Sequence, residues 1–234
     1  MEEIDKLKQL LQCARGQAGY FTEAQADCMG VHELKKFERT GQIVRRARGV
    51  YQVSAVHCPS FIERLGLLQC GFVDREGWPA IAFSHLTALH LHGYAAQPEV
   101  VQFRPLTKSL KCLIPGGLYS QEKRTLSPEE SVHLDDGIKC TSLLSTLVDL
   151  LDHHLDHRVI VAEALTAAVS NQELSRADIL QCPKHSAFML SAIGERCDKV
   201  AASADHPESK ELSVAIKLYA ERMAAKRAAN RRSL

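Results

Sequence analysis

The sequence predicts an α+β protein made of a winged helix-turn-helix, a small mixed-sheet α/β domain and a helical C-terminal region. Three observations predict this organisation. Two short helical patterns near the N-terminus are separated by a glycine, and a β-branched hairpin follows them directly. Further along, short strands alternate with helices to about residue 155, and only helical patterns come after that point. We place the three parts at residues 1–56, 57–155 and 156–234.

The composition is that of an ordinary globular protein, with 45% hydrophobic and 24% charged residues in a chain of 234. No apolar run is long enough for a membrane-spanning helix or a secretory signal, which predicts a soluble cytoplasmic protein. The eight cysteines are scattered and form no C-x-x-C pair. This distribution favours reduced, mostly buried thiols over a disulfide framework or a zinc ribbon.

The first element is an amphipathic helix over Glu2–Arg15. Its apolar side chains recur at helical spacing, and they are Ile4, Leu7, Leu10 and Leu11. We expect this stripe to pack beneath the helix-turn-helix. Tyr20 and Phe21 follow, and we expect both to dock between the first helix and the wing.

The helix-turn-helix begins at Thr22, whose hydroxyl can cap a short helix. Gly30 ends that helix, because a tight turn between helices needs a residue that tolerates positive φ. Val31, Leu34 and Phe37 then recur at the spacing of a second helix. Helix, glycine turn and helix together are the layout of a helix-turn-helix.

A hairpin follows the second helix. Its strands are the runs QIVRR and GVYQV, joined by Ala47 and Arg48, with Gly49 where the turn needs positive φ. A hairpin in this position is a wing.

Positive charge is concentrated on this segment. Between Val31 and Val53, six basic residues stand against Glu33 and Glu38, a net charge of +4, whereas the whole chain carries +1. Cations on a helix and wing can neutralise DNA phosphates and release counterions, although charge runs also occur simply as solvated helix faces. The predicted DNA-contacting residues are Thr22, His32, Lys35, Lys36, Arg39, Arg45, Arg46, Arg48 and Tyr51.

The segment GYFTEAQADCMGV, with the basic helix and RRARGVYQV after it, resembles the N-terminal winged helix of AbiEi antitoxins from type IV toxin–antitoxin systems. The resemblance implies a non-enzymatic protein that represses its own promoter and neutralises a nucleotidyltransferase-like toxin. SHLTALHLHG resembles the start of the second domain in this family, where a strand leads into a short helix. The helix SLLSTLVDLLDHH extends the resemblance, more loosely, to about residue 155.

The second domain is expected to start with a short helix in FIERLGLLQCGFV that covers the hairpin. Ser84 can cap a helix that Gly93 ends. VVQFRP, LKCLIPG, SVHLDD and GIKCTS read as strands of a small mixed or antiparallel sheet, with Asp136-Gly137 as a hairpin turn. Ser142 or Thr141 then caps a helix with leucines on one face.

The C-terminal region reads as helices over Val159–Val169, Ser175–Leu180, Ala187–Ala202 and Glu208–Arg232. Lys217–Leu234 carries a net charge of +5, whereas Glu129–Asp178 carries −7. This segregation suits one nucleic-acid face and one protein-binding face. The basic end is either a second phosphate-binding arm or a solvated helix end, and the arm would use Lys226, Arg227, Arg231 and Arg232.

Three clusters of residues could carry chemistry, but each has a simpler structural explanation. The first, a metal site, would use His153, His157, Asp152 and Asp156; the second, a general base, would be one of His85, His90 and His92; the third, a nuclease site, would use Asp135, Asp136 and Lys139. No Walker A, G-x-G-x-x-G or H-E-x-x-H motif occurs. We predict no catalytic residue, metal or cofactor.

Two functions are therefore favoured over a third, a metal-dependent nuclease. The first is a DNA-binding antitoxin whose partners are double-stranded operator DNA and a cognate toxin. The alternative is a stand-alone winged-helix regulator whose C-terminal region senses a ligand or mediates oligomerisation. A nucleotidyltransferase gene beside this one would favour the antitoxin.

Overall fold

The computed structural model describes residues 2–114, 117, 119–153, 157–181, 185, 188–190 and 192. The chain divides into two compact units. The first contains Met1–Leu91 and Gln97–Thr146, and the second contains His92–Ala96 and the chain from Leu147 onward. The first unit therefore holds both the winged helix and the sheet domain, and the predicted boundary at residue 56 stays a prediction about independent folding.

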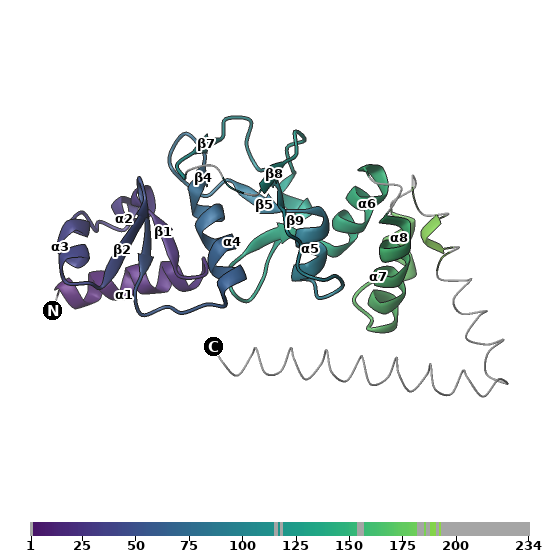
Figure 1. The fold of residues 1–234 in the computed structure, drawn as a ribbon, viewed down its shortest axis with the longest axis horizontal. Coiled ribbons are helices and arrows are strands. Elements are labelled where there is room, and N and C mark those ends of the chain that lie inside the picture. Colours follow the sequence, from purple (N-terminus) through teal and green to yellow (C-terminus); the bar gives the residue numbers. More distant parts are fainter. Residues whose placement is uncertain are drawn as a thin grey trace. The chain divides into compact units, whose positions relative to one another are not determined.

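The N-terminal part of the first unit is a winged helix-turn-helix (Figure 1). Its elements in order are α1 (Glu2–Arg15), β1 (Tyr20–Thr22), α2 (Glu23–Cys28), α3 (Leu34–Arg39), β2 (Ile43–Ala47) and β3 (Val50–Val53). The strands form an antiparallel sheet in the order β1-β3-β2. The predicted helices and hairpin are confirmed. Tyr20 and Phe21 are both buried, and they begin β1, a strand too short to leave an alternating pattern. Phe21 packs with Leu10 of α1 as expected, whereas Tyr20 packs with Val50 and with Cys70 of α4 (Ser60–Gly71).

The core of the winged helix is apolar and contains the three residues that defined the second predicted helix. Val31, Leu34 and Phe37 are each at most 6% exposed. Leu10 on α1 packs into the same cluster, but Ile4 is 62% exposed. The predicted stripe on α1 is therefore wrong at Ile4, because the buried side of this helix is centred further along the chain.

The rest of the first unit is built around a five-stranded mixed sheet (Figure 1). Its elements are α4 (Ser60–Gly71), β4 (Phe72–Val73), β5 (Ile81–Phe83), α5 (His85–Leu91), β6 (Val101–Pro105), β7 (Lys111–Cys112), β8 (Tyr119–Gln121), the 3-10 helix η1 (Pro128–Glu130), β9 (Ser131–His133) and β10 (Lys139–Thr141). The strand order is β8-β6-β5-β10-β9, and β4 pairs separately with β7.

The sheet is mixed because β5 pairs parallel with β10 and β6 pairs parallel with β8, whereas the other neighbours are antiparallel. This confirms the predicted mixed sheet and the hairpin at Asp136-Gly137. β4 and β8 were not predicted. They span two and three residues, which is too short for a period-two pattern to be recognised.

Aromatic side chains dominate the core of this part. Phe72, Phe83 and Phe103 are each at most 3% exposed, and the ring centroids of Phe72 and Phe103 lie 4.7 Å apart. Leu65 on α4 and Ile138 beside β10 join them. Each fully buried side chain of this size contributes about 1.5–3 kcal/mol relative to exposure.

The start of α5 differs from the expectation. The backbone N–H of Leu86 donates to the Gln102 carboxamide at 3.1 Å, so a side chain from β6 caps the helix. The Ser84 hydroxyl lies 2.9 Å from Nδ1 of His85 instead. The predicted cap at Ser84 is corrected accordingly, because a neighbouring strand supplies the acceptor.

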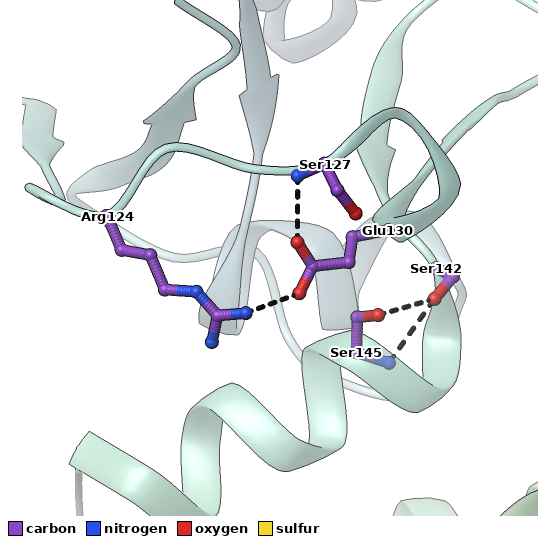
Figure 2. A network of polar contacts seen from close by, with 5 residues as sticks. All are labelled: Arg124, Ser127, Glu130, Ser142 and Ser145. Carbon is purple, nitrogen blue, oxygen red and sulfur yellow. Dashed lines mark hydrogen bonds and ion pairs between the residues drawn. The ribbon is translucent and has the colours of Figure 1, made fainter. Parts of the chain in front are cut away.

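The start of α6 (Leu143–His153) confirms the cap predicted there (Figure 2). The Ser142 hydroxyl accepts from the backbone N–H of Ser145 at 3.3 Å. Figure 2 also shows Glu130, whose carboxylate accepts from Arg124 at 2.7 Å and from the backbone N–H of Ser127 at 2.8 Å. The Glu130 carbonyl accepts from the N–H of Ser142, which connects this loop to the helix start.

Helix α4 joins the winged helix to the sheet domain within the first unit. It contacts β1 and β3, as expected for a helix that covers the hairpin. A Cβ on Gly66 would lie 2.8 Å from the Tyr20 ring, so the helix backbone approaches β1 closely. The backbone N–H of Ala18 donates to the Asp136 carbonyl at 3.2 Å and adds a contact with the β9–β10 turn.

The second unit contains most of α6, together with α7 (Arg158–Ser170) and α8 (Arg176–Leu180). Ser175 caps α8 by accepting from the backbone N–H of Asp178. The helices predicted over Val159–Val169 and Ser175–Leu180 are thus confirmed. The predicted helices over Ala187–Ala202 and Glu208–Arg232 lie largely or wholly outside the described residues, as do Lys226, Arg227, Arg231 and Arg232.

Six described cysteines are free thiols, as predicted. Only Cys70 and Cys140 are buried, whereas Cys28 and Cys112 are exposed. The expectation of mostly buried thiols is therefore wrong for the described cysteines. Among the helices that the structure describes, none is long and apolar enough to cross a membrane.

Candidate nucleic-acid interface

The exposed face of α3 is basic because its apolar side chains anchor the other face. Leu34 and Phe37 are buried in the core. This orientation leaves Lys35, Lys36 and Arg39 exposed. Long cationic side chains held on a rigid helix are suited to contact a phosphate backbone.

The turn before α3 is rigid. Thr22 and Gln25 form a capping box, in which Gln25 N donates to the Thr22 hydroxyl and Thr22 N donates to the Gln25 carboxamide. Gly30 has φ +72°, and the N–H of Val31 donates to the Ala26 carbonyl at 2.9 Å. The angle between α2 and α3 is thereby fixed by backbone geometry.

The two adjacent arginines of β2 point to opposite sides of the wing. Arg45 stands opposite Tyr51, which packs into the winged-helix core. The register shifts between Arg45 and Ala47, so the side on which Arg46 lies is given by its contacts with Gln52 and Glu63. Glu38 of α3 and Arg45 both lie close enough to Tyr51 to influence the pKa of its hydroxyl, which burial raises. Arg45 therefore lies on the α3 side of the wing, and Arg46 lies on the other side.

Arg46 is held by a polar network that reaches α4. Its Nε donates to the Gln52 carboxamide oxygen at 2.8 Å, and its guanidinium lies 3.7 Å from the Glu63 carboxylate. Gln52 and Tyr20 also donate to Glu63, at 3.2 and 3.4 Å. Burial and the Glu63 carboxylate raise the pKa of Tyr20 to about 12, so this phenol stays protonated and remains a donor.

The tip of the wing is fastened to the start of α2. Gly49 has φ +71°, and its carbonyl accepts from the backbone N–H of Glu23 at 2.9 Å. Arg48 precedes it in the turn and is exposed. The wing tip therefore presents a cation from a fixed position.

Two acidic side chains beside α3 have basic partners. Glu33 pairs with Lys6 of α1 at 3.0 Å, and this hydrogen bond lowers the pKa of the Glu33 carboxyl. His32 lies 3.2 Å from Asp27 and is exposed. Lys6 was not predicted from the sequence, because no local pattern connects it with Glu33, 27 positions away.

Two predicted DNA-contacting residues have structural positions instead. Thr22 is 1% exposed, and its hydroxyl caps α2. Tyr51 is 6% exposed and stacks on Phe21, with ring centroids 5.6 Å apart. The burial of both side chains argues against direct contact with DNA, so the proposal below does not include them.

Comparison with known families decides what this domain is. Residues 8–54 match the family model described as a transcriptional regulator, AbiEi antitoxin. These residues form an AbiEi antitoxin domain. The match covers about a fifth of the chain and includes α2, α3, the wing and all six of their cations. No curated protein matches the chain.

The match confirms the family that the sequence resembled. The helices and strands confirm the predicted mixture of α and β structure. The family implies a DNA-binding antitoxin role, and its members are typically non-enzymatic. The match ends at Ser54 and does not extend to the sheet domain or to the second unit.

In each of the three clusters that could carry chemistry, the structure shows at least one residue in a contact that stabilises the fold. Asp136 accepts from the N–H of Ile138 in a turn, and burial raises the pKa of its carboxyl. Asp152 lies 2.7 Å from His185. His85 is buried beside Ser84. Across the part of the chain that the structure describes, no three His, Cys, Asp or Glu side chains are grouped to hold a metal ion.

Proposed function

We propose that this protein is a DNA-binding antitoxin that represses its own type IV toxin–antitoxin operon and neutralises a nucleotidyltransferase-like toxin. DNA contact is assigned to α3 and the α3 side of the wing. The proposed contact residues are exposed cations, namely Lys35, Lys36, Arg39, Arg45 and Arg48, with His32 at their edge.

One observation carries the DNA-binding part of this proposal. The cations of α3 and the wing tip are exposed on an AbiEi antitoxin domain, while Lys6 neutralises the neighbouring Glu33. A duplex placed against this surface would meet several positive charges from two rigid elements. Each phosphate contact would release counterions from the DNA and favour binding.

Operator binding is tested with the DNA immediately upstream of the protein's own gene. Fluorescence anisotropy would compare this DNA with a scrambled duplex of equal length and base composition at several salt concentrations. Autorepression predicts affinity for the upstream DNA at least about 10³-fold higher than for the scrambled DNA at equal salt. Equal affinity for both duplexes would contradict an operator in this region.

The assignment of the surface is tested by removing its charges. Replacing the five proposed cations with alanine should reduce the slope of log K against log salt by about 0.9 for each phosphate that the variant no longer neutralises. The matched control replaces five exposed cations of the sheet domain, namely Arg75, Lys108, Lys111, Lys123 and Arg124. An unchanged slope in the five-residue variant would overturn the assignment.

The basic C-terminal segment is proposed as a second phosphate-binding arm. Its cations are Lys226, Arg227, Arg231 and Arg232. Replacing these four with alanine should weaken binding to all duplexes by a similar factor, because phosphate contacts carry no sequence information. A variant that binds every duplex as the parent does would remove the arm from the proposal.

The neutralising activity rests on the resemblance to the family and needs its own test. The nucleotidyltransferase gene adjacent to this one would be expressed alone and together with the antitoxin. Co-expression should restore growth that the toxin alone inhibits. Continued inhibition at equal toxin levels, or the absence of such a gene, would favour a stand-alone regulator.

A further inference from the structure

A cavity of about 410 Å³ lies within the first unit, where the winged helix meets the sheet domain. Residues from α1 and the loop after it form one wall, and the β9–β10 hairpin forms another. The lining residues are Gln12, Cys13, Gly16, Gln17, Gln25, Gln69, Trp78, Pro79, Ile81, His133, Gly137 and Lys139. The volume falls in the usual range for small-molecule sites, roughly 300–1,000 Å³.

The carboxamides in its walls are held in place by hydrogen bonds. Gln17 and Gln25 each donate to the other's carboxamide oxygen at 3.1 Å. Gln69 donates to the Gly137 carbonyl at 3.1 Å and accepts from the backbone N–H of Lys139 at 2.7 Å. A cavity with preformed walls loses little conformational entropy when a ligand binds.

The basic side chains that line the cavity are Lys139 and His133. Lys139 and His133 are cross-strand partners in the β9–β10 hairpin, so their side chains lie on the same face. No Asp or Glu lines the cavity beside them. Burial lowers the pKa of Lys139, and burial and the Lys139 charge lower the pKa of His133. A lysine beside an imidazole that can donate an N–H, with no carboxylate in the lining, is suited to an anion.

The remaining wall is apolar and contains an aromatic ring. Trp78 is 40% exposed, and Pro79 and Ile81 lie next to it in the lining. A flat ligand group can stack on the indole while a charged group reaches the basic pair.

We propose that this cavity binds a small organic anion, with its carboxylate or phosphate against Lys139 and His133 and its flat portion against Trp78. The inference goes beyond the proposed function and does not depend on it. A ligand in this position would contact both the winged helix and the hairpin of the sheet domain.

The chain offers a direct readout, because Trp78 is its single tryptophan. Fluorescence excited at 295 nm would be followed as sodium benzoate or adenosine 5′-monophosphate is added to the full chain at constant ionic strength. Benzamide and adenosine serve as neutral partners of the two probes. We expect a saturable change with at least one anion and at least tenfold weaker binding of its neutral partner. The two anions separate a carboxylate site from a phosphate site.

Substitutions in the lining test whether the anion binds at Lys139 and His133. Lys139→Met should weaken binding of the anion at least tenfold, whereas Lys123→Met, at an exposed lysine outside the cavity, should not change it. If Lys139→Met does not fold, as judged by circular dichroism, the test uses His133→Gln, a change at an exposed residue. This variant should bind the anion at least threefold more weakly than the parent. No saturable change with either anion, equal binding of the neutral partners, or unchanged binding by the deciding variant would overturn the proposal.

Discussion

The carboxylate of Glu63 on α4 lies 3.7 Å from the guanidinium of Arg46 on the wing. The same carboxylate accepts from Tyr20 of β1 and Gln52 of β3, so it connects two strands of the small sheet with the helix that covers them. Arg46 is 44% exposed, but its charge is directed toward α4. This contact separates Arg46 from the cations assigned to DNA.

Removing the Glu63 charge should make Arg46 available to phosphates. In Glu63→Gln, the Tyr20 and Gln52 hydrogen bonds can persist while the ion pair is removed. We expect tighter binding to any duplex and a salt slope steeper by up to about 0.9, which corresponds to one further phosphate contact. Stability should change by less than about 1 kcal/mol, because the pair is partly exposed.

A double-mutant cycle separates the release of Arg46 from a simple gain of net charge. If Arg46 mediates the effect, Glu63→Gln should change DNA affinity much less in an Arg46→Ala background. Glu76→Gln, at an exposed loop position, controls for net charge. The explanation fails if Glu63→Gln increases affinity equally with and without Arg46.

The adjacent wing arginines should differ in their effect on DNA binding. Arg45 lies on the α3 side of the wing, whereas Arg46 is bound by Gln52 and Glu63. Arg45→Ala should reduce the salt slope by about 0.9, and Arg46→Ala should change it by less than half that amount. Fluorescence anisotropy at four or more salt concentrations measures both slopes. A larger effect from Arg46→Ala would reverse the assignment of the two faces.

The sequence predicted the winged helix well because its signals are local. The Thr22 cap, the glycine turn and the spacing of Val31, Leu34 and Phe37 all lie within 16 consecutive residues, and the structure confirms each. Regular strand alternation would place Arg45 and Arg46 on opposite faces, and the contacts of Arg46 with Gln52 and Glu63 agree with this although the register shifts between Arg45 and Ala47. Alternation does not reveal which face of the wing α4 covers, because Glu63 of α4 lies 17 positions from Arg46.

The cavity between the winged helix and the sheet domain could not be predicted either, because its lining residues are also far apart in the sequence. Gln12 and Cys13 of α1 line the same cavity as His133 and Lys139 of the β9–β10 hairpin, and no sequence pattern connects residues so far apart. Sequence proximity groups Lys139 only with Asp135 and Asp136, as a nuclease cluster. Cross-strand pairing with His133 gives Lys139 a different chemical context.

Protonation of His133 should destabilise the fold at mildly acidic pH. Burial, followed by the charge of Lys139, lowers the pKa of His133 below 6.5, so the unfolded chain binds this proton more readily than the folded chain does. Neutral His133 contributes to the stability of the fold above pH 6.5, and this contribution is lost as the pH falls through the lowered pKa of the folded state. The melting temperature should therefore fall less between pH 7.5 and 5.5 in His133→Gln than in the parent. An equal decrease in both proteins would contradict this pKa direction.

The contact between Gly137 and Gly16 should make Gly137 much less tolerant of a side chain than Gly30. Both Gly137 and Gly30 have positive φ, +76° and +72°, so alanine at either position carries the left-handed strain of about 1–2 kcal/mol. A Cβ on Gly30 meets nothing within 4 Å, whereas a Cβ on Gly137 would overlap the backbone of Gly16. Gly137→Ala should therefore lower the free energy of unfolding by at least about 1 kcal/mol more than Gly30→Ala, as measured by urea denaturation. Equal losses would show that the β9–β10 turn does not pack against the loop after α1 in solution.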